Sequence, residues 1–128
     1  AIYDLLASNY FAPKDDDRGP YRVRLSVSDT NRLVIDINDE NDQPLRRVLV
    51  SLMSLRRVVK DYFKICESYF DALQKRTVQQ LESIDMARRG LHDEGADLLI
   101  ERLADKIDVD ADTARRLFTL ICVLHIRA

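Results

Sequence analysis

The fold of this chain is decided at residues 56–70, which read RRVVKDYFKICESYF. Apolar side chains recur there at every third or fourth position, the spacing that predicts an amphipathic helix with one buried face. The apolar stripe extends from Leu55 to Leu73, so we expect the helix to span about residues 54–74. Most of the stability of such a helix comes from packing of its apolar face, so the preceding residues matter next.

Ahead of this helix the apolar period changes to two, which is typical of half-buried strands. Residues 21–27 alternate Tyr, Val, Leu and Val with Arg and Ser. The alternation resumes at 33–37 after a polar turn at 28–31, and again at 45–52 after an acidic turn that ends at Pro44. These short connections predict a three-stranded antiparallel meander with one face in water.

The other segments predict helices. Residues 2–11 carry a short helical pattern that Pro13 stops, a longer one runs over about 77–104, and a last one runs from 110 to 126. Strands gathered ahead of helices indicate the α+β class. We therefore expect one domain over 1–128, a meander covered on one face by three C-terminal helices, with a short N-terminal helix.

Two glycines interrupt the helix predicted over 77–104. Gly90 and Gly95 either weaken this helix or, together with Ala87, form a notch through which a neighbouring element approaches closely. Asp110 or Asp112 is expected to cap the last helix.

The composition is that of an ordinary globular domain. Apolar residues make up 46% and charged residues 33% of 128 residues, and the net charge of −2 disfavours nucleic acid as the partner. No apolar run is long enough to span a membrane, and no leader pattern precedes the first helix. Two cysteines, Cys66 and Cys122, fit structural thiols in a reducing cytoplasm. Because the chain opens at Ala1 inside a helical pattern, we expect that an N-terminal piece is missing.

Three long blocks carry a resemblance to a known family. They read RRVVKDYFKICESYFDAL at 56–73, IDMARRGLHDEGADLLIERL at 84–103 and DTARRLFTLICVLHIRA at 112–128. With these blocks the chain resembles uncharacterised protein family 0262, a set of small bacterial proteins with a further N-terminal stretch. The resemblance implies no established activity, so it supplies no catalytic residues.

A candidate anion site lies at the start of the 54–74 helix. Arg57, Lys60 and Lys64 share its polar face with Arg56 beside them, whereas acids follow in its last turns. This order opposes the helix dipole, and a phosphate or carboxylate could use both the free N–H groups of the first turn and the arginines. The commoner explanation for such bases is ion pairing with acids of the same fold.

Catalytic and metal chemistry find little support. His92, Asp93 and Glu94 are the one cluster of imidazole and carboxylates, but neighbours along a helix point apart and make a poor metal site. His125 lies on an apolar face and is expected in the core. We therefore predict no catalytic residues, no metal and no cofactor.

The leading hypothesis is a non-catalytic cytoplasmic interaction or regulatory module that forms a homodimer through the last helix. The final turns of that helix are apolar nearly all round, which predicts an interface at Leu120, Ile121, Leu124 and Ile126. The alternative is a sensor or enzyme that binds a small anion or phosphometabolite at residues 56–60. A third hypothesis, single-stranded nucleic acid on the arginine-rich outer face of the sheet, is disfavoured by the net charge, and no membrane partner is expected.

Overall fold

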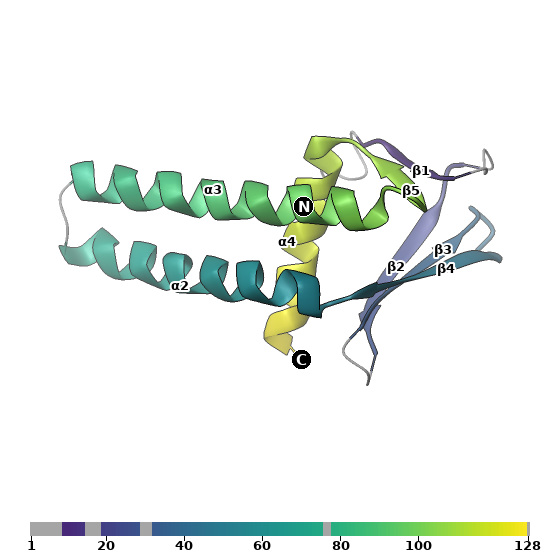
Figure 1. The fold of residues 1–128 in the computed structure, drawn as a ribbon, viewed down its shortest axis with the longest axis horizontal. Coiled ribbons are helices and arrows are strands. Elements are labelled where there is room, and N and C mark those ends of the chain that lie inside the picture. Colours follow the sequence, from purple (N-terminus) through teal and green to yellow (C-terminus); the bar gives the residue numbers. More distant parts are fainter. Residues whose placement is uncertain (1–8, 15–18, 29–31, 76–77, 128) are drawn as a thin grey trace.

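The computed structural model of the chain describes residues 9–14, 19–28, 32–75 and 78–127. The described strands largely precede the helices, so the α+β class is confirmed (Figure 1). In chain order the elements are β1 (Phe11–Pro13), β2 (Arg22–Val27), β3 (Arg32–Asn38), β4 (Pro44–Ser51), α2 (Met53–Lys75), α3 (Val78–Leu103), β5 (Ile107–Val109) and α4 (Ala111–Arg127).

The predicted meander is present as an antiparallel sheet in the order β2-β3-β4. Its register aligns Leu25 with Ile35 and Ile35 with Val48, so most of the apolar residues of the three strands share one face. That face forms the core against α2, α3 and α4, whereas the other face carries polar residues such as Arg24, Asp36 and Arg47 together with Val34 and Leu49. Alternation along each strand therefore decides which face is buried.

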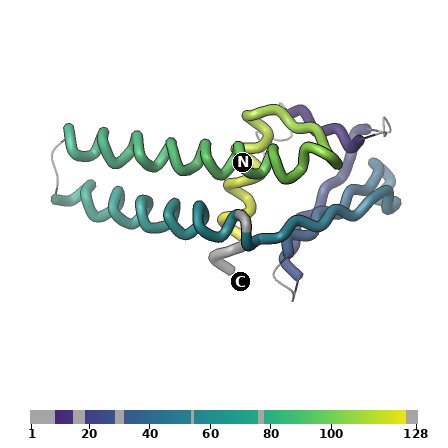
Figure 2. Tube along the Cα trace, in the orientation of Figure 1, coloured from purple at the N-terminus to yellow at the C-terminus, as the bar shows by residue number. Residues whose placement is uncertain are grey.

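A second, two-stranded sheet pairs β1 with β5, which lie far apart in sequence and side by side in space (Figure 2). The predicted helix over 2–11 fails at its end, because Phe11 is a strand residue aligned with Val109; residues 2–8 lie outside the described chain. Pro13 does not stop a helix but closes β1 opposite Ile107. Three residues are too few for alternation to be distinguished from a helical pattern.

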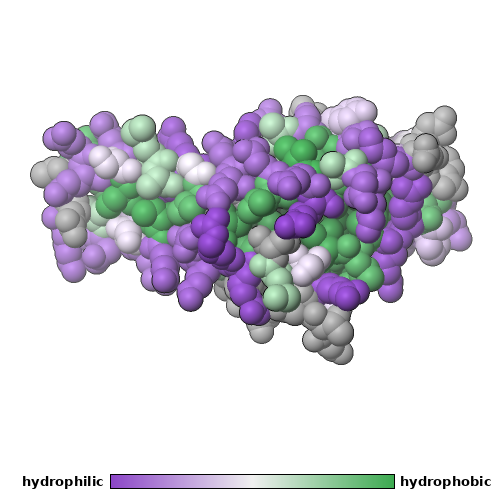
Figure 3. Space-filling model, viewed as in Figure 1, coloured by the Kyte–Doolittle hydropathy of each residue, from purple (hydrophilic) through white to green (hydrophobic). Residues whose placement is uncertain are grey.

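The helices α2 and α3 form a long hairpin that projects from the sheet (Figure 1). Its base joins the main core cluster through Leu55, Val58 and Leu99, whereas Phe70 near its tip is 68% exposed. On the surface, apolar side chains follow the seam between the two helices (Figure 3). Among the described residues, no helix is both long and apolar enough to cross a membrane.

The last helix, α4, crosses the base of the hairpin and contacts both α3 and β2 (Figure 1). Its Phe118 is fully buried, and a Cβ atom built on Gly95 of α3 would lie 2.3 Å from the ring of Phe118. A Cβ built on Gly90 would meet nothing within 4 Å. The predicted notch is therefore confirmed at Gly95, where α4 approaches, and is wrong at Gly90.

Candidate functional site: an apolar groove between β2 and α4

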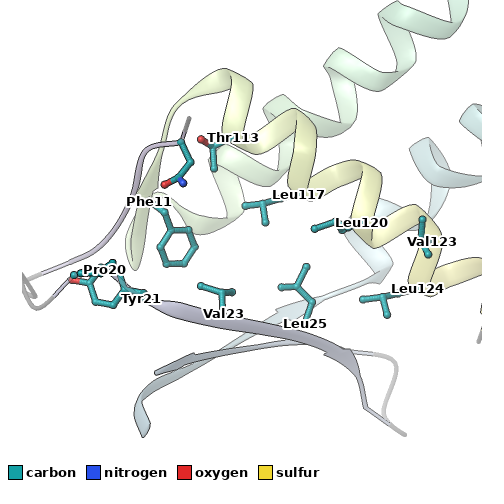
Figure 4. A pocket seen from close by; sticks show the side chains of 12 residues that line it. Phe11, Pro20, Tyr21, Val23, Leu25, Thr113, Leu117, Leu120, Val123 and Leu124 are labelled. Atoms are coloured by element: carbon teal, nitrogen blue, oxygen red, sulfur yellow. The ribbon is translucent and has the colours of Figure 1, made fainter. Parts of the chain in front are cut away.

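An open groove lies between β2 and α4 (Figure 4). Side chains at every second residue of β2 form its floor, because alternate residues of a strand point to the same face. Side chains three or four residues apart on α4 form its opposite wall, because that spacing keeps them on one side of a helix. Phe11 of β1 lies at one end of the groove (Figure 4). The lining consists of Asn9, Phe11, Gly19, Pro20, Tyr21, Val23, Leu25, Thr113, Leu117, Leu120, Val123 and Leu124.

The groove has a volume of about 710 Å³, within the range of about 300–1,000 Å³ that ligand sites occupy. Its walls are mainly apolar, and the two valines among them remain open to water, Val23 at 38% and Val123 at 44% exposure. Soluble proteins rarely leave large contiguous patches of such apolar residues exposed to water. The groove is therefore a surface with unused hydrophobic contact area.

Thr113 holds the polar end of the groove in place. Its backbone N–H donates to Oδ1 of Asp110 at 2.8 Å, which confirms Asp110 as the cap of α4. Hydrogen bonds from the side chain and the backbone N–H of Thr113 lower the pKa of the Asp110 carboxyl, because they favour its charged form. The Thr113 hydroxyl accepts a bond from the Tyr10 N–H at 2.9 Å, and Thr113 is 1% exposed. One residue thus joins the start of α4 to the segment that leads into β1.

The opposite side of α4 is fixed by a cluster around His92 of α3. Nε2 of His92 lies 2.8 Å from the hydroxyl of Thr119, and its ring meets the ring of Phe118 edge-on at 5.1 Å and that of Tyr62 at 5.3 Å. Burial lowers the pKa of His92, because the charged imidazolium would lose water contact. His92 is thus a packing residue that orients α4.

The two cysteines are free thiols, Cys122 buried and Cys66 half-buried. Burial raises the pKa of Cys122 to about 12, so its sulfur stays protonated at neutral pH and is a poor nucleophile. Among the described residues, no group of three or more histidines, cysteines and acids could hold a metal ion. The side chain of His125 lies outside the described set.

The predicted anion residues lie on the exposed side of α2, away from the groove. Arg57 pairs with Asp61 at 3.1 Å and with Glu94 of α3, and these partners raise its pKa, the Glu94 bond most. Arg56, Lys60 and Lys64 are exposed and have no ion pair with the part of the chain that the structure describes. The anion site stays a prediction, with one of its four bases already neutralised.

The predicted interface residues divide between two sides of α4. Leu120 and Leu124 line the groove, whereas Ile121 is 3% exposed and belongs to the core of the same chain. The side chain of Ile126 lies outside the described residues. The last helix therefore does present apolar residues outward, but toward the space over β2, and a dimer through them stays a prediction.

Sequence reasoning missed the β2 half of the groove. Val23 and Leu25 carry the alternation of a buried strand face, and we expected the helices to cover them. Alternation does not distinguish the two outer strands of the sheet: β4 buries Val48 and Val50, whereas Val23 of β2 is 38% exposed. Phe11 was not predicted as a groove residue, because the sequence pattern predicted a helix there, whereas the structure has it in strand β1.

The fold and the groove define a small α+β protein with an open apolar groove and a core closed by a helical hairpin. The model of the uncharacterised protein family UPF0262 matches residues 1–127, and the chain belongs to this family. The resemblance carried by the three sequence blocks is thereby confirmed.

Relatives are UPF0262 proteins of bacteria. One from Paramagnetospirillum magneticum is 60% identical over 127 residues, which cover 99% of this chain and 80% of that protein. One from Rhodospirillum rubrum is 59% identical and covered at 78%, and one from Maricaulis maris is 56% identical and covered at 79%, with 99% and 100% of this chain aligned. No solved structure matches the chain.

Proposed function

We propose that this protein is a non-catalytic interaction module of the cytoplasm, and that the β2–α4 groove receives apolar side chains of a protein partner. The observation that carries the proposal is the groove, an open apolar cavity of about 710 Å³. Covering such a surface removes apolar area from water, which contributes about 25 cal/mol per Å². A groove between a helix and an outer strand also suits the two common modes of peptide docking, a helix in a groove and an added strand.

The chemistry of the lining supports binding over catalysis. None of the residues that the structure shows around the groove has a carboxylate, imidazole, thiol or amine side chain. The hydroxyl of Thr113 is occupied by the Tyr10 N–H. General acid–base or nucleophilic catalysis needs a titratable or activated group at the reacting atoms, and the phenol of Tyr21 is the one titratable side chain among the lining residues, the rest being mainly packing surface.

A second copy of the chain is one candidate partner. Leu120 and Leu124 belong both to the groove and to the interface that the sequence predicts. Light scattering on the purified chain across a hundredfold range of concentration tests this part, and a constant monomer mass would contradict the dimer. A heterologous partner would remain the candidate in that case.

The groove is tested by selecting an unbiased peptide library against the protein. We compare two aspartate substitutions at apolar residues of equal exposure, Val123→Asp in the groove and Leu49→Asp on the outer face of the sheet, which are 44% and 43% exposed. Selected peptides should bind the unaltered protein and Leu49→Asp, and lose binding to Val123→Asp. Circular dichroism checks that both variants are folded. Peptides that bind Val123→Asp undiminished, or a library that yields no binder, would refute the proposal.

A further inference from the structure

The strand that forms the floor of the groove, β2, is one of the two outer strands of its sheet. β2 pairs with β3 along one edge, and among the described residues no strand pairs with its other edge, because β1 pairs with β5 instead. The backbone N–H and C=O groups of an outer strand form a ready template for a further strand. In this protein that template borders an apolar groove into which Val23 and Leu25 point (Figure 4).

The other face of the same strand is basic. Arg22 and Arg24 are exposed, and neither forms an ion pair with the part of the chain that the structure describes. The acid aligned with Arg24 on the neighbouring strand is Asp36, and its carboxylate pairs with Arg47 of β4 at 2.6 Å. The β2 edge therefore presents apolar side chains on its groove face and two unpaired guanidinium groups on its outer face.

We propose that the partner contributes an extended segment, with alternating apolar and acidic residues, which adds to the free edge of β2 as a fourth strand. Successive side chains of a strand point to opposite faces, so one set enters the groove against Leu120 and Val123 while the acids meet Arg22 and Arg24. This inference rests on the proposed function and specifies its partner. The six residues of β2 set the length of the added strand at about six residues, roughly 20 Å.

Charge separates this partner from a second copy that uses its own β2. If two copies joined their β2 edges with the same face inward, Arg22 and Arg24 of both chains would lie side by side on the outer face. Like charges on neighbouring strands destabilise the pairing, whereas opposite charges contribute about 0.2–1 kcal/mol per pair. An acidic strand satisfies the two arginines, and a second β2 strand does not.

The test uses the full chain and three synthetic peptides of eight residues. The first alternates leucine or valine with glutamate, the second has the same composition with the acids grouped at one end, and the third repeats the first with its edge-facing amides N-methylated. We expect the first peptide to bind and the other two to bind at least about tenfold more weakly. The second peptide cannot place its apolar residues on one face and its acids on the other, and the third cannot form the main-chain hydrogen bonds to β2.

Charge reversal on the protein provides the second arm. Arg24→Glu should weaken the first peptide about tenfold, as expected for a lost charge-assisted bond, whereas Arg32→Glu, an exposed arginine on the middle strand, should leave its affinity within about twofold. Amide signals of β2 should shift on binding in nuclear magnetic resonance spectra. Added salt should weaken the interaction, because the paired charges are exposed.

The outcomes separate this inference from the proposed function. If selected peptides require Val123 but tolerate N-methylation and Arg24→Glu, the groove binds a helix or an apolar ligand, and strand addition is refuted while the proposed function stands. If no peptide binds at all, both fail. If the first peptide binds only after Leu5 and Leu6 are changed to aspartate, the N-terminal segment of the chain itself is the occupant, and the inference is overturned.

Discussion

Replacing Gly95 by alanine tests how α4, the wall of the groove, is held against α3. The added Cβ would lie 2.3 Å from Cε1 and Cζ of Phe118 and 2.7 Å from Cδ1. Unstrained carbon contacts are about 3.5–4.0 Å, so the ring or the helix must move by more than about 1 Å. Phe118 is fully buried and touches His92 and Tyr62, so it has no free space to enter.

The magnitude follows from a matched pair of substitutions. Gly90 and Gly95 lie in the same helix, and each change to alanine contributes up to about 1 kcal/mol of helix propensity. Gly90→Ala meets nothing within 4 Å, so we expect that stabilisation to appear in full. Gly95→Ala adds an overpacking cost of about 1–3 kcal/mol, occasionally more. The difference between the two variants isolates that cost, since the propensity contribution cancels.

The assay is urea unfolding followed by circular dichroism, with the free energy of unfolding extrapolated to zero urea for both variants. We expect Gly90→Ala to be more stable than the unaltered protein and Gly95→Ala to be less stable than Gly90→Ala by about 1–3 kcal/mol. Equal stabilities would mean that Phe118 does not pack on Gly95. The placement of α4, and with it the geometry of the groove, would then be refuted.

Two further predictions concern groups outside the groove. His92 has a lowered pKa in the folded protein, so the unfolded chain binds a proton more readily, and the free energy of unfolding should fall as the pH drops through about 6.5. In urea unfolding measured from pH 7.5 to 5.5, His92→Gln should make this fall smaller. The same dependence of stability on pH in His92→Gln and the unaltered protein would contradict the buried neutral imidazole. Because Arg57 is already paired with Asp61 and Glu94, we expect that added phosphate will not raise the melting temperature in a saturable way. A saturable rise in melting temperature that disappears in Lys60→Glu would instead establish the anion site. Such a site would stabilise the fold by about 2.7 kcal/mol at a phosphate concentration a hundredfold above Kd.

The parts of the fold that follow from periodicity were predictable. The stripe from Leu55 to Leu73 and the alternation in residues 21–27 specify a helix and a strand, and the structure has both elements. The predicted buried face is present at the start of the helix, at Leu55 and Val58, whereas Val23 of the strand is 38% exposed. Phe11–Pro13 was not predictable, because a three-residue strand has no period of its own and exists only where β5 lies beside it. The pairing of residues about a hundred positions apart is a property of the assembled fold.

The groove illustrates the same limit for the candidate site. Leu120 and Leu124 were recognised as outward apolar residues because a helix turn with no polar side needs a second contact. Val23 and Leu25 were expected to lie under the helices, since alternation shows which face of a strand is apolar but not what covers it. The packing of the assembled fold decides that point: β2 and β4 are both outer strands, and β4 has buried apolar residues whereas β2 has none.

The unusual feature of β2 is that one face carries exposed apolar side chains and the other carries two arginines that form no ion pair with the described residues. An outer strand is normally protected from further pairing by charges, prolines or covering segments. Arg22 and Arg24 provide that protection against basic strands and against a second β2, because a like charge on the adjacent strand is unfavourable. The same two residues attract an acidic strand, and the apolar groove beside Val23 supplies the contact area that charge pairs alone lack. Selectivity would thus come from the outer face and affinity from the groove face, which is why the charge and apolar substitutions must be measured separately.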